Sequence, residues 1–158
     1  MSRLDYCNGL FQDLPKYLIK KLQRVQNRAA RLVKKLHWRS RMTRYLKELH
    51  WLPVSERIEF KILLITFKAL NNLSPVYIRD LFRYYQPPRA MRSSASARKL
   101  LHVGKVRTRF GTRALRNCGP RLWNALPMNI RLSTSLVQFK GLLKTHLFNR
   151  YYNRVTLS

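Results

Sequence analysis

The chain has very few acidic side chains. Its 158 residues include 33 Lys and Arg but only six Asp and Glu, and no carboxylate follows Asp80. The formal net charge is +27, and such an excess repels itself unless something anionic neutralises it. A solvated basic face is the ordinary explanation of basic residues, but this imbalance favours a polyanionic partner. We expect nucleic acid first and an anionic membrane second.

Cysteine, histidine and glycine are also scarce. The two cysteines, Cys7 and Cys118, indicate free thiols in a reducing compartment rather than a disulfide scaffold. No cysteine has a ligand partner at zinc-site spacing, so we expect neither a metal nor another cofactor. The glycines are isolated, and none forms a phosphate-cradling loop. The polar N-terminus does not resemble a secretory signal, which favours an intracellular location, nuclear or cytoplasmic.

No hydrophobic run is long enough to cross a membrane. The segment 50–72, HWLPVSERIEFKILLITFKALNN, comes closest, but four charges between Arg57 and Lys68 interrupt it, and a membrane span needs about 20 apolar residues without interruption. Its apolar residues spread round most of a helical circumference, which predicts a buried central helix starting near Pro53. We expect Ile62 to be almost fully buried. One polar strip remains on this helix, formed by Arg57, Lys61, Lys68 and Asn72.

The segment 16–36 predicts a strongly amphipathic helix. Its apolar stripe consists of residues at three- and four-residue steps: Leu18, Leu22, Val25, Ala29, Leu32, Val33 and Leu36. The opposite face is cationic and contains no acid: Lys16, Lys20, Arg24, Arg28, Arg31 and Lys35. Like charges at i,i+4 destabilise an isolated helix by roughly a few tenths of a kcal/mol each, which argues for an external anion. Such a helix can also lie on a membrane surface.

The other segments predict shorter elements. We expect a short helical piece over 2–14, a short helix between Trp38 and Leu49, and a third amphipathic helix from Ser74-Pro75 to about Tyr85. Residues 86–99 are rich in Pro, Ser and Arg, which is typical of a mobile basic linker, and 100–106 predict a strand or an extended arm.

In the last third of the chain, Gly111 and Gly119-Pro120 predict breaks around two short helical turns. Ser135 with Gln138 has the spacing of a capping box before a last helix, whose apolar stripe is Leu136, Phe139, Leu143 and Leu147. The tail YYNRVTLS is expected to fray.

The sequence offers little for catalysis. Glu56 and Glu59 lie one helical turn apart and could share a metal, but a pairing of Glu59 with an Arg of a neighbouring helix is favoured by the rule that buried acids are paired. We therefore expect no enzyme activity from this chain by itself. The tryptophans Trp38, Trp51 and Trp123 could stack nucleobases, but their apolar neighbours favour core packing.

Several long motifs follow one another in a familiar order: SRLDYCN (2–8), LPKYLI (14–19), LQRVQNRAARLV (22–33), LHWLPVSERIEFKILLITFKALN (49–71), SPVYIRDL (74–81), RSS (92–94), GPRLWNALPMNIR (119–131) and FKGLLKTHLF (139–148). Together they resemble the C-terminal, thumb and post-thumb part of the reverse transcriptase polyprotein of non-LTR, LINE-type retrotransposons. The resemblance covers nearly the whole chain. It departs at Lys34-Lys35, where relatives often have a small polar or Gly turn.

The resemblance implies a thumb that grips a template–primer duplex, downstream of an endonuclease and a polymerase palm. The paired catalytic aspartates of the palm have no match here, so the chain looks like a detached tail, from a truncated element copy or a gene-model fragment. We expect an all-α fold with a thumb-like helical domain over 1–85, a basic linker or arm over 86–110, a small, mostly helical C-terminal unit over 111–153 and a frayed tail over 154–158.

The expected function is sequence-independent binding of RNA or DNA backbone, with an upstream palm as a further partner and a membrane as the less favoured one. Phosphate contacts are assigned to a first set of cations on the amphipathic helix and to a second, mobile set: Lys16, Lys20, Arg24, Arg28, Arg31 and Lys35, then Arg92, Arg98, Lys99, Arg107 and Arg109. Two alternatives stay open: an inert relic, or a basic helical protein that binds a membrane surface or a protein partner.

Overall fold

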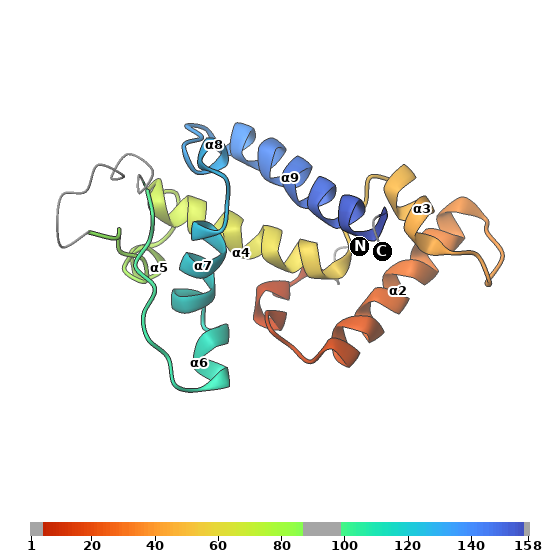
Figure 1. Cartoon of the computed structure of the whole chain (residues 1–158), viewed down its shortest axis with the longest axis horizontal. Coiled ribbons are helices and arrows are strands. Elements are labelled where there is room, and N and C mark those ends of the chain that lie inside the picture. The colour runs from red at the N-terminus through yellow and green to blue at the C-terminus, as the bar shows by residue number, and fades with distance from the viewer. Residues whose placement is uncertain (1–4, 87–98, 157–158) are drawn as a thin grey trace. The chain divides into compact units, whose positions relative to one another are not determined.

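A computed structural model describes residues 5–86 and 99–156, and these are mainly helical (Figure 1). For Arg109, Val155 and Thr156 it describes the backbone alone. The elements in chain order are the 3-10 helix η1 (Asn8–Phe11) and the α-helices α2 (Lys16–Lys34), α3 (Met42–Glu48), α4 (Val54–Leu70), α5 (Val76–Arg79), α6 (Arg109–Arg113), α7 (Leu115–Asn124), α8 (Met128–Arg131) and α9 (Leu136–Thr156). The predicted all-α class is confirmed.

The chain divides into two compact units that are interleaved in the sequence. The first unit comprises Met1–Phe60 and Lys144–Ser158, and the second comprises Lys61–Leu143. Helices α4 and α9 therefore each supply residues to both units. In this division the C-terminal part of α9 groups with the N-terminal helices, and the consecutive domains expected from the sequence stay a prediction.

The core of the first unit contains Ala30, Met42, Leu46 and Tyr152, bordered by half-buried apolar residues of α3 and α9. The Oη of Tyr152 donates a hydrogen bond of 3.0 Å to the Trp51 carbonyl. Helix α9 continues to Thr156, and fraying of the tail stays a prediction.

The core of the second unit is aromatic. The rings of Phe67 and Phe139 stack with centroids 4.2 Å apart, and the Trp123 ring lies 5.8 Å from that of Phe139. Ile62 of α4 is only 1% exposed, which confirms the prediction of a buried central helix.

The stripe on α9 is also confirmed at three of its four positions, where Phe139, Leu143 and Leu147 are fully buried.

Helix α7 corrects the expectation that glycine and proline break this region. Gly119 and Pro120 both lie inside α7, and Gly111 lies inside α6. A Cβ at Gly119 would lie 2.7 Å from Cε1 of Phe82 and 2.9 Å from Oγ1 of Thr66. Gly119 therefore serves close packing, not a turn, and Pro120 costs the helix the one hydrogen bond that its missing N–H would have made.

The predicted third helix is also wrong in length, because α5 ends at Arg79. The chain then turns, and residues 83–85 run antiparallel to 100–102 through a bridge between Tyr84 and Leu101. Pro75 occupies the N-cap position, and the hydroxyl of Ser74 caps nothing among the described residues. Of the segment 100–106, Leu101 alone is assigned β structure, and most of the predicted linker, 87–98, lies outside the described residues.

Three helices end in the same way without glycine. Lys35, His50 and Asn72 follow α2, α3 and α4 with φ values of 51°, 51° and 59°. Each is followed by a residue whose N–H bonds back to the carbonyl five positions earlier, such as Leu36 to Arg31 at 3.0 Å. This is the Schellman arrangement, which usually places glycine in the left-handed conformation. Helix α9 begins as predicted, since the Ser135 hydroxyl accepts from the N–H of Gln138 at 3.1 Å.

Candidate nucleic-acid interface

The inward face of α2 carries two glutamines beside the buried Ala30. The Gln26 side chain is fully buried and donates a hydrogen bond of 2.8 Å to the Leu52 carbonyl, and the Gln23 side chain accepts one of 2.9 Å from the N–H of Val54. Val54 is the first residue of α4, so its N–H has no partner within that helix. The two glutamines thus satisfy the backbone that leads into α4, and this requirement orients α2.

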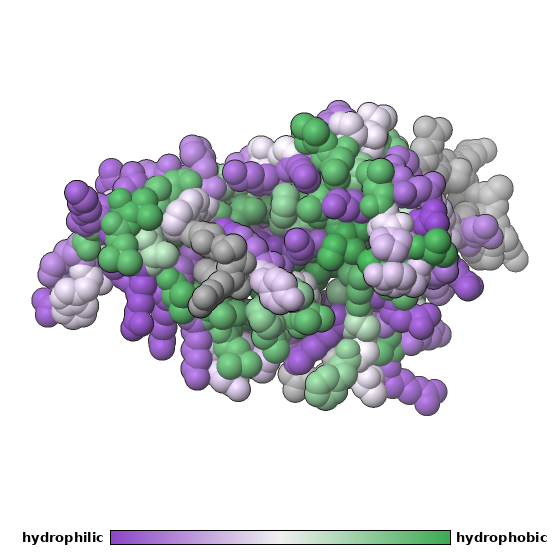
Figure 2. Space-filling view, turned by 180° about the vertical axis from the view of Figure 1, so that it is seen from behind, coloured by the Kyte–Doolittle hydropathy of each residue, from purple (hydrophilic) through white to green (hydrophobic). Residues whose placement is uncertain are grey.

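The predicted apolar stripe of α2 is consequently half exposed. Val25 is 51% and Leu32 80% exposed, whereas Leu18, Leu22 and Ala29 are intermediate and Gln26 and Ala30 are buried. By helical geometry the buried side is rotated by about a quarter turn from the centre of the apolar stripe. In Figure 2, hydrophobic groups and long hydrophilic side chains accordingly lie among one another over α2 and α3 at the left of the view.

The cationic face of α2 is open. Five of the six predicted cations are exposed: Lys16, Lys20, Arg24, Arg28 and Lys35. In the part of the chain that the structure describes, no carboxylate forms an ion pair with any of the five. Helical spacing places Lys20, Arg24 and Arg28 in one row, where each is repelled by the next. This arrangement leaves their charge available to an external anion.

Arg31, the sixth predicted cation, has an internal role. It is half-buried, and its Nη2 donates a hydrogen bond of 3.3 Å to the Ser40 carbonyl in the turn between α2 and α3. Beside it, Lys34 and Arg44 share the carboxylate of Glu48 at 3.4 and 3.2 Å. Arg31 therefore belongs to the packing of the α2–α3 turn.

Trp38 was expected in the core and is instead 68% exposed, so that expectation is wrong. The guanidinium carbon of Arg39 lies 4.7 Å from the centroid of its ring. A cation stacked on an exposed indole gains roughly 0.5–1 kcal/mol and keeps the ring in place. The core interpretation is confirmed for Trp123, which is buried, while Trp51 is half-buried.

The second predicted set of cations belongs to the other unit. Arg107 is exposed, and Arg109 begins α6 with its side chain outside the description. Lys99 is half-buried, with φ 58°, and its carbonyl accepts a hydrogen bond of 2.7 Å from Trp123 Nε1. Arg92 and Arg98 lie outside the described residues.

The two glutamates of α4 are engaged within the first unit. Glu59 accepts from Nη2 of Arg150 on α9 at 2.5 Å, which confirms the predicted pairing with an Arg of a neighbouring helix. Glu56 is buried and accepts from the Ser55 hydroxyl at 2.5 Å. Burial raises the pKa of the Glu56 carboxyl above its ordinary value, although the Ser55 hydrogen bond opposes this.

Metal-ligating residues do not gather in the described ranges, 5–86 and 99–156, where no three His, Cys, Asp or Glu side chains could hold an ion together. Among the same residues no helix is both long and apolar enough to cross a membrane. Cys7 is exposed, Cys118 is buried, and no disulfide joins them. Comparison with known proteins finds no matching family model, no similar curated protein and no similar solved structure.

Proposed function

We propose that this chain binds the phosphate backbone of nucleic acid without sequence preference, through the cationic face of α2. The observation that carries the proposal is the row Lys20, Arg24 and Arg28, which is exposed and has no ion-pair partner among the described residues. An exposed helix with several cations can contact successive phosphates of a nucleic acid. Each contact releases a condensed counterion, and this release favours binding. Helix α2 bears no acid that would repel the strand.

The resemblance to the thumb and post-thumb part of LINE-type reverse transcriptases supports the same proposal. In that family the thumb grips the template–primer duplex, and the matching motif LQRVQNRAARLV lies within α2. We therefore propose a non-catalytic, duplex-binding tail that works beside a polymerase palm. The exposed Trp38, held against Arg39, is suited to stack on a terminal base pair of such a duplex.

The salt dependence of binding tests the proposal. Labelled duplex DNA should bind with little sequence preference, and the log of the affinity should fall linearly with the log of salt concentration. Arg24→Gln/Arg28→Gln should reduce the slope by about 1.8, at about 0.9 for each lost phosphate contact. The control Lys140→Gln/Lys144→Gln removes the same charge, with the same i,i+4 spacing, from exposed positions of α9. Equal slopes for the two variants would contradict the assignment to α2.

The same proposal includes the absence of polymerase activity. With template, primer, nucleotides and magnesium or manganese, the chain should incorporate no nucleotide, because Glu59 is paired with Arg150 and the sequence lacks the palm motif with its aspartates. Primer extension by purified protein is the measurement. Extension that is lost on mutation of Glu56 or Glu59 would contradict this part of the proposal.

A membrane surface is the second candidate partner, favoured by one observation. Val25 and Leu32 are exposed beside the cations of α2, and a basic helix with exposed apolar side chains can insert shallowly into an anionic bilayer. Vesicles containing phosphatidylserine and duplex DNA, compared at equal total charge, separate the two candidates. Tighter binding to vesicles, lost in Leu32→Gln, would favour the membrane, whereas binding to neither ligand would favour an inert relic.

A further inference from the structure

The C-terminal end of α7 builds a second surface of interest. The side-chain amide of Asn124 pairs with both backbone groups of Leu101, since it accepts from the N–H and donates to the carbonyl, each at 2.8 Å. Trp123 Nε1 donates a hydrogen bond of 2.7 Å to the carbonyl of Lys99, two residues before Leu101. The segment 99–101 is thereby fixed to α7, and Leu101 itself is only 1% exposed.

This fixed segment in turn positions residues 83–85. The N–H of Tyr85 bonds to the Leu100 carbonyl at 2.9 Å, and the N–H of His102 bonds to the Arg83 carbonyl at 2.8 Å. Arg83 and His102 are therefore held side by side by backbone pairing. Tyr84 and Tyr85, although aromatic, remain 49% and 44% exposed.

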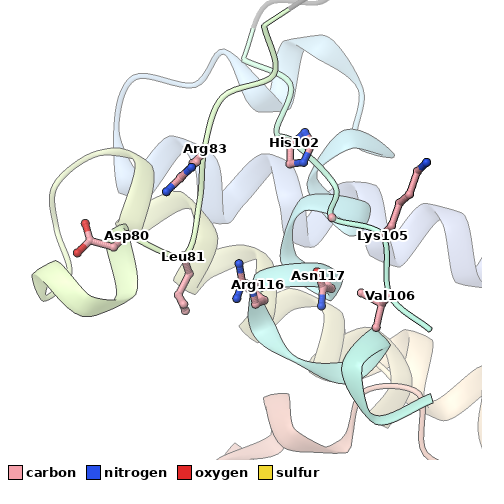
Figure 3. A pocket seen from close by; sticks show the side chains of 9 residues that line it. Asp80, Leu81, Arg83, His102, Lys105, Val106, Arg116 and Asn117 are labelled. Carbon is pink, nitrogen blue, oxygen red and sulfur yellow. The ribbon is translucent and has the colours of Figure 1, made fainter. Parts of the chain in front are cut away.

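A basic hollow of about 480 Å³ opens on one side of this pairing. Its lining includes Arg83, His102, Lys105 and Arg116, and the volume lies within the range of roughly 300–1,000 Å³ that small-molecule sites occupy. In Figure 3, Arg83 and Arg116 face the hollow from two different segments, while Lys105 extends away at its edge. The carboxylate of Asp80, at the opposite edge, is directed away from Arg116.

Among the described residues no carboxylate forms an ion pair with Arg83, Lys105 or Arg116. Asn117, which also lines the hollow, is held in place, since its Nδ2 donates to the Gly111 carbonyl at 2.7 Å. Guanidinium groups that converge on a concave site are typical of a place that receives a phosphate.

An aromatic hollow adjoins the basic one. It has a volume of about 750 Å³ and is lined by Phe82, Arg83, Tyr84, Tyr85, Gln86 and His102. Arg83 and His102 line both hollows, so the two are neighbours on one surface of the second unit. Proteins that bind single strands combine cations along the backbone with exposed aromatic rings on which bases stack.

We propose that these adjoining hollows form a binding site for single-stranded nucleic acid, with a phosphate between Arg83 and Arg116 and the adjacent base on Tyr84 or Tyr85. The site is separate from the duplex contacts proposed for α2, because it lies in the other unit and requires an unpaired base. It stands whether or not α2 binds duplex.

Two probes of equal charge test the proposal on the full chain. One is a fluorescein-labelled oligothymidylate of about eight nucleotides, within the range of about 4–16 that single-strand-binding folds cover, and the other is its abasic counterpart. The wild-type protein should bind the oligothymidylate at least about fivefold more tightly than the abasic strand, because stacking favours the strand with bases. Equal affinities for the two probes would overturn the proposal.

Variants then place the base contact. Tyr84→Ala/Tyr85→Ala should abolish the preference for bases, whereas Tyr84→Phe/Tyr85→Phe should retain it and thereby controls for folding. A preference that survives the alanine pair, or that is lost only in Trp38→Ala, would overturn the assignment to the second unit. Thymidine monophosphate that binds as tightly as the oligonucleotide would overturn the assignment to a strand.

Charge variants separate this site from α2. Arg83→Gln/Arg116→Gln should weaken the oligothymidylate by about tenfold or more at low salt, beyond the effect of Lys140→Gln/Lys144→Gln. Arg24→Gln/Arg28→Gln should leave the ratio of the affinities for the two probes unchanged, so a failure of either proposal is recognisable. The proposal of a second site would be overturned if the ratio of the affinities for the two probes changed in Arg24→Gln/Arg28→Gln and not in Tyr84→Ala/Tyr85→Ala.

Discussion

Helices α2 and α4 show that a regular hydrophobic pattern and actual burial are different properties. The apolar residues of α2 recur at three- and four-residue steps, yet Val25 and Leu32 of this stripe are exposed. Those of α4 are spread round the helix, and Ile58, Ile62, Leu63 and Phe67 are all buried. The pattern predicts that a segment is helical, but its neighbours decide which face is covered.

The largest expected difference between the two helices comes from one substitution made in each. Leu63→Ala removes a side chain that is 1% exposed and should cost about 2–5 kcal/mol of the free energy of unfolding, because it leaves a cavity. Leu32→Ala removes one that is 80% exposed and should change that free energy by about 0.5 kcal/mol or less.

Urea denaturation of the full chain, followed by circular dichroism at moderate salt, measures both. Salt is needed because the +27 charge destabilises the folded chain when it is unscreened. Equal losses for the two leucines would mean that the buried and exposed faces are assigned wrongly.

Close packing against α4 gives the next largest effect. Gly119→Ala would place a Cβ 2.7 Å from Phe82 Cε1 and 2.9 Å from Thr66 Oγ1, so one of these groups must move, at a cost of about 1–3 kcal/mol. The matched change Gly141→Ala, in α9, meets no side chain within 4 Å and should stabilise the helix by about 0.5–1 kcal/mol. Thermal unfolding of both variants tests the sign, and a stabilising Gly119→Ala would contradict the close approach.

How far the sequence predicts this fold depends on whether a signal is local. The buried α4, the Ser135 cap and the stripe of α9 follow from spacing within one segment, and all are confirmed, the stripe at three of its four positions. The rule that buried acids are paired, and not a local motif, predicts that Glu59 pairs with an Arg of a neighbouring helix. The structure identifies this Arg as Arg150.

The failures share the opposite property, because each depends on residues far away in the sequence. Gln23 and Gln26 turn α2 toward the backbone of 52–54, some 26 to 31 positions later, and no local pattern records that. Gly119 resembles a helix breaker until Phe82 and Thr66 are known to lie against it. The hollows beside Arg83 were missed for the same reason, since they require pairing between 83–85 and 100–102.

The row of cations on α2 is exposed, whereas Glu56 of α4 is buried, and the pH dependence of stability tests this difference. The α4 residue Glu56 is buried with a pKa raised above its ordinary value of 4.5, so the folded state binds its proton more tightly than the unfolded state does. The contribution of Glu56 to stability is then fully present below about pH 4.5 and is lost as the pH rises through the folded pKa. Glu56→Gln should therefore be more stable than wild type at pH 7, and the difference should shrink toward pH 4.

Denaturation midpoints of wild type and Glu56→Gln across that pH range provide the measurement. Glu59→Gln is the informative control, because it leaves the partly buried Arg150 without its carboxylate and should lower stability instead. If the effect of Glu56→Gln on the denaturation midpoint were the same at pH 4 and pH 7, burial of the ionised carboxylate would not be what lowers the stability of the wild type.

The smallest expected effect concerns how the two helices end. Lys35 follows α2 and Asn72 follows α4, both in the left-handed conformation that glycine adopts freely. Asn tolerates this conformation well, whereas Lys pays roughly 1 kcal/mol or more for it. Lys35→Gly should therefore raise the free energy of unfolding by about 0.5–1 kcal/mol, and Asn72→Gly should change it by only a few tenths.

Lys35→Ala separates conformation from charge, because it removes the same cation without easing the left-handed backbone. It should not stabilise the chain, yet both Lys35 variants should lower the salt slope of duplex binding by about 0.9 if Lys35 contacts a phosphate. If Lys35→Gly and Lys35→Ala raised the free energy of unfolding equally, the gain would come from relief of charge repulsion and not from the left-handed backbone at the end of α2. A slope unchanged in both would remove Lys35 from the phosphate contacts while leaving Arg24 and Arg28 to account for binding.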